Sequence, residues 1–210
     1  MIEKKRILAI IARLKQRYPA AECSLTYDGE AWKLLIMARL SAQCTDARVN
    51  IVCKSLFAEL PSIDAVADAP LSRIEELVKS CGLYRTKAAD IKSAMEIVRT
   101  KHGGRIPDSM EELLALPGVG RKIANLMLGD IFGQPAIVAD THCIRISGRL
   151  GIAPKTKDAT KVEKALKSVI PPAEQSDFCH RMVLFGRDVC TARSPQCEAC
   201  PLADLCKKIF

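Results

Sequence analysis

Four cysteines near the C-terminal end of the sequence constrain its fold more than any other feature. Cys190, Cys197, Cys200 and Cys206 follow a C-x6-C-x2-C-x5-C spacing within a short polar segment. The close pair can chelate one face of a metal centre, and the two outer thiols can reach it from either side. Thiolates select zinc or iron–sulfur clusters over harder metals. Structural zinc usually takes two close pairs and the common ferredoxin runs are spaced differently, so the spacing leaves both metals open.

The composition is that of a globular protein with one large domain or two small ones. The chain has 210 residues, of which 49% are hydrophobic, and this is ample for a core. No run of 18 apolar residues occurs, so we expect no membrane span, and the first residues indicate a helix rather than a signal peptide. We therefore expect a cytoplasmic protein, in which ten cysteines indicate metal binding or free thiols rather than disulfides. Six of them are expected to be small buried hydrophobes, namely Cys23, Cys44, Cys53, Cys81, Cys143 and Cys179.

The charge balance favours a polyanionic partner. The formal net charge is +8, from 32 basic and 24 acidic residues. A cluster with four thiolates would bring it to roughly +6, which still suits nucleic acid. Many soluble proteins are equally basic without such a partner, so charge alone does not decide.

Helical periodicity dominates the sequence, and prolines separate the helices. Two apolar faces at helical spacing are formed by Ile7, Ile10, Ile11 and Leu14, and by Ala88, Ile91, Met95 and Val98. Capping-box patterns that begin at Ser72 and Ser109 predict two helix starts. The apolar run 136–139 is too short to found a sheet and is expected to be a buried connection. We therefore predict an all-α fold.

A glycine-rich turn between two predicted helices is the candidate phosphate-binding site. The segment 116–122 reads Leu-Pro-Gly-Val-Gly-Arg-Lys and predicts a helix–hairpin–helix. Gly118 and Gly120 allow a tight turn and a close approach by another surface. The backbone amides at the start of the second helix could donate to phosphate. An ordinary glycine turn is the alternative, but Arg121 and Lys122 directly after it favour a DNA-backbone site.

Lys122 and Asp140 are the candidate reactive groups, and each also has an ordinary interpretation. The helix dipole acts on Lys122 with only about 0.3–1 kcal/mol, too little to make a nucleophile. Burial or the nearby Arg121 would have to do most of the activation, and otherwise Lys122 is a solvated surface charge. Asp140 follows an apolar run and is expected to cap the next helix, leaving its second oxygen for a ligand. His142 is interpreted as structural.

Several segments together resemble one family. The hairpin segment, the run Val138-Ala-Asp-Thr-His142 and the cysteine spacing are similar to endonuclease III, a DNA glycosylase and AP lyase family of the helix–hairpin–helix superfamily. Shorter matches are Ser41–Asp46, Gly82–Tyr84, Lys87-Ala88, Pro107, His180 and Gly186-Arg187. The resemblance covers essentially the whole chain in order. It implies a [4Fe–4S] cluster rather than zinc, by family inference and not by ligand chemistry.

The resemblance also implies an architecture. Two helical domains would enclose a DNA-binding cleft between them. Residues 23–134 would form a helical barrel that contains the hairpin, and residues 1–22 with 135–210 would form the cluster domain. Lys122 and Asp140 would then face one another across the cleft. The four tail cysteines would be the cluster ligands.

The implied reaction is removal of oxidised pyrimidines from duplex DNA, followed by a nick 3′ to the abasic site. The damaged base is flipped out, Lys122 attacks C1′ of the deoxyribose, and a Schiff base leads to β-elimination. Asp140 stays ionised, stabilises positive charge on the sugar and helps to move protons. Gln43 and Leu83 would enter the duplex, although Leu83 could instead be a core residue and Gln43 a solvated helix end.

The expected partner is double-stranded DNA that carries oxidised pyrimidines or abasic sites. We expect a monomer with no membrane contact, nucleoid-associated if the source is bacterial. The other DNA contacts implied by the resemblance are Gly118, Gly120, Arg121 and Arg193.

The sequence departs from the family pattern at three places. Arg193 is the only basic residue in the cluster loop 191–196, Cys143 replaces a bulkier apolar residue, and Leu114 stands where some relatives carry an acid. Two alternatives stay open. One is an adenine or mismatch glycosylase without lyase activity, and the other is a DNA-binding module without enzymatic activity.

Overall fold

The computed structural model describes residues 2–210, and within them every regular element is helical. The chain divides into two compact units. One unit is Ser24–Phe132, and the other combines the residues up to Cys23 with Gly133–Phe210. The predicted all-α fold is therefore confirmed, and the apolar run 136–139 is a buried connection without strand structure, as expected.

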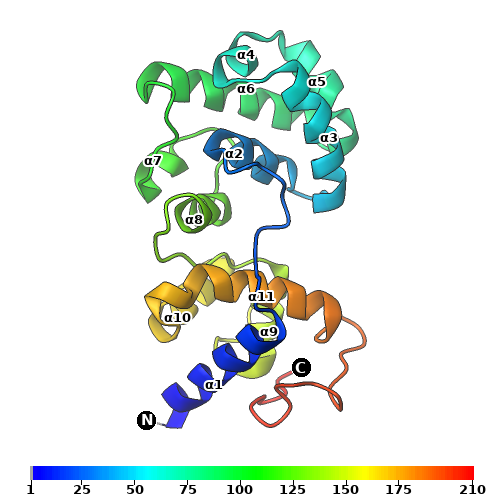
Figure 1. Ribbon diagram of the computed structural model, residues 1–210, viewed down its shortest axis with the longest axis vertical. Coiled ribbons are helices and arrows are strands. Elements are labelled where there is room, and N and C mark those ends of the chain that lie inside the picture. The colour runs from blue at the N-terminus through cyan, green and yellow to red at the C-terminus, as the bar shows by residue number, and fades with distance from the viewer. Residues whose placement is uncertain (1) are drawn as a thin grey trace. The chain divides into compact units, whose positions relative to one another are not determined.

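The unit Ser24–Phe132 is built around a buried helix, α2 (Ala31–Leu40). Seven of the ten residues of α2 are buried, and a helix that is apolar on nearly all sides belongs in a core. Its neighbours in contact include α3, α6 and α8. The remaining α-helices of this unit, labelled in Figure 1, are α3 (Asp46–Glu59), α4 (Ile63–Asp68), α5 (Leu71–Val78), α6 (Tyr84–Lys101), α7 (Met110–Leu114) and α8 (Arg121–Asp130). A short 3-10 helix, η1 (Lys79–Cys81), follows α5.

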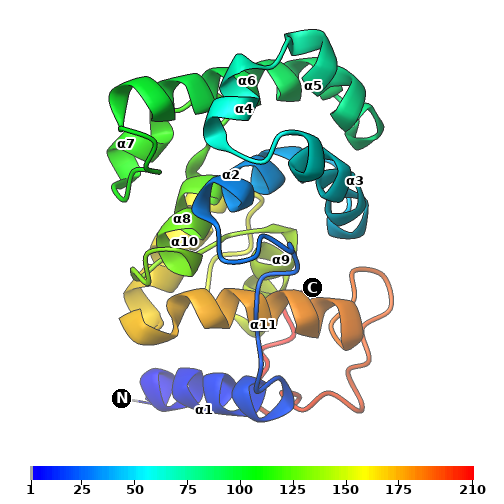
Figure 2. The same ribbon diagram turned by 45° about the horizontal axis from the view of Figure 1, so that its top comes forward.

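The helix α6 carries one of the two predicted apolar faces. Ala88, Ile91, Met95 and Val98 are all buried. Helix α6 contacts α4 and α5, which lie alongside it in Figures 1 and 2. The predicted start of α5 at Ser72 is wrong. The helix begins at Leu71 after Pro70, whose carbonyl accepts from Arg73 N at 2.9 Å, and no side chain caps it. Proline fixes the entry geometry, so the serine is not needed as a cap.

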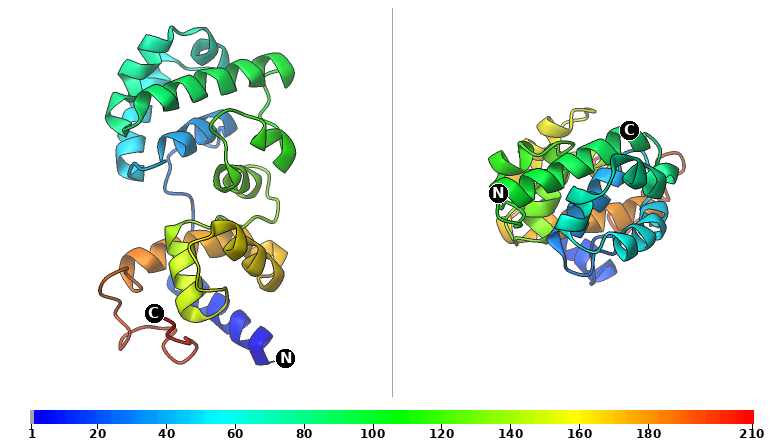
Figure 3. Two further views of the ribbon diagram at one scale, coloured as in Figure 1. Left: turned by 180° about the vertical axis from the view of Figure 1, so that it is seen from behind. Right: turned by 90° about the horizontal axis from the view of Figure 1, so that it is seen from above.

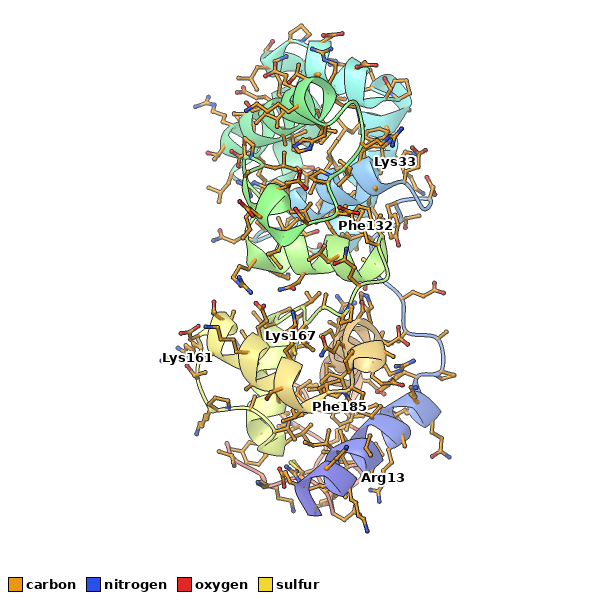
Figure 4. All side chains as sticks on the ribbon, turned by 90° about the vertical axis from the view of Figure 1, so that its left-hand side faces the viewer. Arg13, Lys33, Phe132, Lys161, Lys167 and Phe185 are labelled. Atoms are coloured by element: carbon orange, nitrogen blue, oxygen red, sulfur yellow. The ribbon has the colours of Figure 1, made fainter. Side chains whose placement is uncertain are left out.

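The described residues of the second unit form five helices. They are α1 (Ile2–Arg17), α9 (Thr141–Leu150), α10 (Ala159–Val169), the 3-10 helix η2 (Pro172–Glu174) and α11 (Gln175–Asp188). The predicted apolar face of α1 is confirmed, since Ile7, Ile10, Ile11 and Leu14 are buried. Helix α1 lies beside α11 in Figure 2. Phe185 of α11 is 1% exposed and lies in the interior of this unit, whereas Lys161 of α10 lies at its surface (Figure 4).

Candidate functional site

The hairpin is formed by α7, the turn 115–120 and α8. Ser109 caps α7, because its hydroxyl accepts from Glu112 N at 3.2 Å and donates to the Glu112 carboxylate at 2.7 Å. This predicted helix start is confirmed. Leu113, Leu116 and Val119 are buried and anchor the turn. The sequence therefore builds the hairpin from one cap and three apolar contacts.

The two glycines of the hairpin differ in how closely other protein atoms approach them. Gly118 has φ +74°, and a Cβ there would lie 2.5 Å from Arg39 Nε and 2.8 Å from Asp90 Oδ2. Arg39 and Asp90 form a partly buried ion pair beneath the turn, with Nε donating to Oδ2 at 2.8 Å. Gly120 has an ordinary φ of −97°, and a Cβ there would meet nothing within 4 Å. Gly118 is thus required by the protein itself, while the space at Gly120 is open to a ligand.

Lys122 is the second residue of α8 and is exposed. Gly120 is the N-cap and supplies no side-chain acceptor, and the first turn of α8 contains no acidic residue. The first amides of a helix have no partner within the helix, so this end of α8 is suited to an anion. The predicted position of Lys122 in the first turn is confirmed. The protein therefore leaves the Lys122 side chain exposed rather than buried.

Asp140 caps α9, as predicted. Its Oδ1 accepts from Cys143 N at 2.7 Å, and the residue is half-buried after the buried run 136–139. The cap uses one carboxylate oxygen and fixes the side chain. The arrangement leaves Oδ2 as the group that could serve a ligand.

Helix α9, which Asp140 caps, packs against α11. Gly186 permits this packing, because a Cβ there would lie 2.3 Å from His142 Nδ1. His142 Nδ1 also lies 3.2 Å from Arg145 Nη2, which supports its structural interpretation. Cys143 is fully buried, and a hydrogen bond with Cys179 together with burial raises its pKa well above the usual thiol value. Cys143 is therefore a packing residue, as expected.

Gln43 and Leu83 share an uncommon backbone conformation. Their φ values are +55° and +46°, in the left-handed region that residues with a side chain rarely adopt. Both are exposed, and Leu83 is 62% exposed at the N-terminus of α6. The core interpretation of Leu83 is therefore wrong. Strained exposed residues of this kind cluster at functional sites.

The C-terminal tail has no helix or strand in residues 189–210, and Figure 3 shows it, in red, running as loops. Leu202 is the one buried residue of the segment 190–210. Cys190, Cys197, Cys200 and Cys206 are half-buried and line a single cavity. Thiols arranged around a cavity suit a [4Fe–4S] cluster, in which four cysteines ligate the cluster.

Hydrogen-bond donors point at three of these four sulfurs. Leu202 N donates to Cys200 Sγ at 3.4 Å, and Lys208 N donates to Cys206 Sγ at 3.3 Å. Arg149 Nη1 lies 3.4 Å from Cys190 Sγ. Hydrogen bonds to cluster sulfurs are one of the ways in which a protein supports and tunes an iron–sulfur centre. The donor set therefore fits a cluster.

Three arginines hold the tail through its backbone carbonyls. Arg6 donates to Leu205 O at 2.7 Å, and Arg13 donates to Pro201 O at 2.8 Å. Arg149 donates to the carbonyls of the first loop residues, Thr191 at 2.7 Å and Ala192 at 2.9 Å. Sequence reasoning missed these contacts and counted the arginines as positive charge for a polyanion. Arg193, in contrast, is exposed on the loop.

Of the six other cysteines, four are buried as predicted. Cys23 and Cys44 are instead half-buried, since each lies in a connection beside a unit boundary or a turn rather than inside a helix.

Comparison with known proteins decides the family. Residues 36–172 match the HhH-GPD superfamily of base excision DNA repair proteins, and residues 190–206 match the iron–sulfur binding domain of endonuclease III. Endonuclease III of Bacillus subtilis is 40% identical over 99% of this chain and 94% of its own length. The Escherichia coli protein is 36% identical over 98% and 97%. The chain belongs to the endonuclease III family.

Solved structures agree with this membership. A trapped covalent intermediate of endonuclease III with DNA is 42% identical, with a TM-score of 0.91 over 98% of this chain and 96% of that one. A thermostable thymine-DNA glycosylase, 21% identical with a TM-score of 0.88, shares the fold.

Endonuclease III family membership defines the enzyme class. The chain is a base-excision-repair enzyme, a DNA glycosylase with AP lyase activity, and its cofactor is a [4Fe–4S] cluster. The alternative of a DNA-binding module without enzymatic activity is therefore wrong. None of the described helices has the length and apolar character needed to cross a membrane.

Proposed function

We propose that this protein excises oxidised pyrimidines from duplex DNA and nicks the strand 3′ to the resulting abasic site, with Lys122 as nucleophile and Asp140 as its partner. The observation that carries the proposal is the local setting of each residue: Lys122 is exposed at a helix N-terminus without a side-chain cap, and Asp140 caps its own helix through one oxygen only. A relative of 42% identity is described as a trapped covalent intermediate with DNA, which supports a covalent step here.

The reaction starts with the lysine amine. Lys122 Nζ attacks C1′ of the damaged nucleotide, the bond from C1′ to the base breaks, and the base leaves with its bonding electrons and a proton. Asp140 stays ionised and stabilises the positive charge that develops on the sugar. Because Lys122 is exposed, the bound nucleotide has to supply the desolvation that makes the amine reactive.

The lyase step follows from the same adduct. Ring opening gives a Schiff base between Lys122 and C1′, a proton leaves C2′, and the C3′–O bond breaks with the phosphate as leaving group. Water then hydrolyses the Schiff base and frees the lysine. Asp140 assists the proton transfers. The two residues belong to different compact units, so the proposed reaction requires both units to engage the same nucleotide.

The remaining residues are proposed to bind DNA or the cofactor. The backbone at Gly118, Gly120 and Arg121 would bind phosphate, and Arg193 would add a phosphate contact from the cluster loop. Gln43 and Leu83 would fill the space left by the flipped base. Cys190, Cys197, Cys200 and Cys206 would hold the cluster, which when bound supplies iron–thiolate bonds that cross-link the tail.

The unit Ser24–Phe132 is proposed to be the helical barrel domain, and the other unit the cluster domain. We also propose that the protein acts as a monomer, in the cytoplasm and at the nucleoid of a bacterial cell. The relatives compared are bacterial, which supports this setting.

Borohydride trapping on DNA with one abasic site tests the reaction and the nucleophile together. Lys122→Gln is expected to abolish the trapped adduct and to retain binding to the same DNA, because the amides of the hairpin are unchanged. Lys161→Gln is the matched control, since Lys161 is also an exposed lysine in the first turn of a helix. A Lys122→Gln protein that is trapped at the wild-type rate would refute the assignment.

Asp140→Asn separates the negative charge of this residue from its role as a helix cap. Asparagine caps helices about as well as aspartate, so the bond from Cys143 N and the thermal stability should be retained. Base excision and nicking should both slow, because the carboxylate charge is lost. Unchanged rates, with the cap intact, would remove Asp140 from the mechanism.

A further inference from the structure

A fully buried lysine, Lys87 of α6, has no part in the proposed chemistry. It is 0% exposed and is among the largest fully buried side chains of the protein. Lysines are almost never fully buried unless their ammonium group is satisfied. The hydrogen-bond partners of Lys87 therefore indicate what the residue is for.

The side-chain nitrogen of Lys87 bonds to the C-terminal ends of α2 and η1, the helices that come before Gln43 and Leu83. Nζ donates to Leu40 O at 2.8 Å and to Cys81 O at 2.7 Å. Leu40 is the last residue of α2, three residues before Gln43, and Cys81 is the last residue of η1, two residues before Leu83. The last carbonyls of a helix have no partner within it. Lys87 thus satisfies one carbonyl at the base of each exposed loop.

The two loops need such an anchor because their tips are strained. Gln43 and Leu83 both have positive φ, and such conformations persist only where the surroundings determine them. Burial raises the pKa of the neighbouring Cys81 thiol to about 11, so this thiol places no negative charge beside the amine at neutral pH. Burial lowers the pKa of Lys87, but a neutral amine still carries two N–H groups for the two carbonyls.

We infer that Lys87 is a positioning residue that holds the loops of Gln43 and Leu83 in register for entry into the duplex. The inference rests on the proposed function, in which Gln43 and Leu83 fill the space left by the flipped base. Lys87 touches neither DNA nor the reacting atoms in this role. It acts through the two carbonyls.

The same helix offers a matched control. Lys92 also donates its ammonium to two backbone carbonyls, those of Ala67 and, at 3.0 Å, Ala69. These carbonyls lie at the end of α4 and not at a strained loop. Replacing Lys92 removes two lysine-to-carbonyl hydrogen bonds from the same helix, together with an ion pair to Glu96 at 3.2 Å, and leaves the loops of Gln43 and Leu83 anchored.

The test compares two substrates for Lys87→Met and Lys92→Met. One is a duplex with a single thymine glycol opposite adenine, and the other is a single-stranded oligonucleotide with one abasic site, which requires no extrusion from a duplex. Losing both hydrogen bonds to the carbonyls should lower kcat/KM for Lys87→Met on the duplex by about ten- to a hundredfold. Nicking of the single strand should change by less than about threefold. For Lys92→Met, both substrates should change by the same factor.

A double-mutant cycle measures the coupling between Lys87 and Leu83, which a general loss of stability would not change. Lys87→Gln retains an amide donor, and it replaces the methionine variant if that protein does not fold, with Lys92→Gln as its control. When the Lys87 variant is combined with Leu83→Ala, the fold-loss in kcat/KM on the duplex should be smaller than the product of the two single fold-losses, because both changes impair the same residue, Leu83.

Equal losses on the two substrates for the Lys87 variants, or full additivity with Leu83→Ala, would overturn the inference. A wild-type protein that nicks neither substrate would instead refute the proposed function. The two failures are therefore distinguishable.

Discussion

The hairpin and the cysteine tail owe their shapes to different forces. The hairpin turn 115–120 lies between two helices, with Leu113, Leu116 and Val119 buried beneath it and an ion pair under Gly118. The tail 190–210 has no regular structure and a single buried residue, Leu202. One region is shaped by packing, as in most protein interiors, while the other has too little apolar surface to hold itself together.

This difference indicates that the cluster stabilises the tail. Arginine-to-carbonyl bonds from Arg6, Arg13 and Arg149 orient the tail, but each is worth only about 1.5–3 kcal/mol. Ordering each residue costs about 1–2 kcal/mol of backbone entropy. For a segment of this length the arginines cannot offset that cost. Metal–thiolate bonds supply the remainder, so removing the metal should affect the tail and spare the hairpin.

Removing one cluster ligand should have the largest effect. Cys200→Ser is expected to lose the cluster, its brown colour and the order of the tail, with a large fall in solubility. Iron analysis and visible absorbance measure the loss. Cys23→Ser is the control, because Cys23 is also half-buried but does not line the tail cavity. Wild-type protein purified without air that contains stoichiometric zinc and no iron would contradict the assignment of the metal.

Substituting the hairpin glycines should separate folding from binding. Gly118→Ala places a side chain at φ +74° and 2.5 Å from Arg39 Nε. The left-handed backbone costs about 1–2 kcal/mol and the overpacking about 1–3 kcal/mol, so denaturant unfolding should show a loss of roughly 2–5 kcal/mol.

Gly120→Ala is the matched substitution. Its Cβ meets nothing in the protein, so stability should change by less than about 0.5 kcal/mol, while DNA affinity should fall because the methyl group occupies the proposed phosphate space. Normal DNA binding by Gly120→Ala would remove this glycine from the interface.

Local patterns in the sequence predicted the parts of the molecule that depend on local contacts. The apolar faces of α1 and α6, the cap at Ser109 and the cap at Asp140 are each set within a few residues. The start of α5 was wrong because Pro70 overrode a plausible serine cap.

Long-range and strained features left no pattern to read. Arg6 and Arg13 reach carbonyls 199 and 188 residues away, and any carbonyl can accept, so no residue type marks the partner. Nor does the sequence mark the positive φ of Gln43 and Leu83, since neither is a glycine or asparagine. The buried position of Lys87 was missed for the same reason, because its acceptors are backbone atoms.

Replacing Leu83, the exposed residue proposed to fill the space left by the flipped base, should affect catalysis and leave folding unchanged. Leu83→Ala is expected to slow excision from a fully paired duplex, because an apolar wedge offsets part of the unstacking free energy of a few kcal/mol. The defect should shrink when the lesion lies opposite a gap. Ile51→Ala is the control, since Ile51 of α3 is also 62% exposed. A Leu83→Ala protein that melts several degrees lower and excises normally would contradict the wedge.

The smallest effect is expected from the one basic side chain of the cluster loop. Arg193 is exposed, so Arg193→Ala should keep its iron and its melting temperature. Each phosphate neutralised contributes a slope of about −0.9 to log K against log salt concentration on duplex DNA, so the slope should become shallower by at most about one contact. Arg149→Ala is the contrasting variant. Its guanidinium holds the carbonyls of Thr191 and Ala192, so it should lose iron faster under chelation. An unchanged salt slope in Arg193→Ala would mean that the loop does not contact phosphate, and that the arginines of this region serve the tail alone.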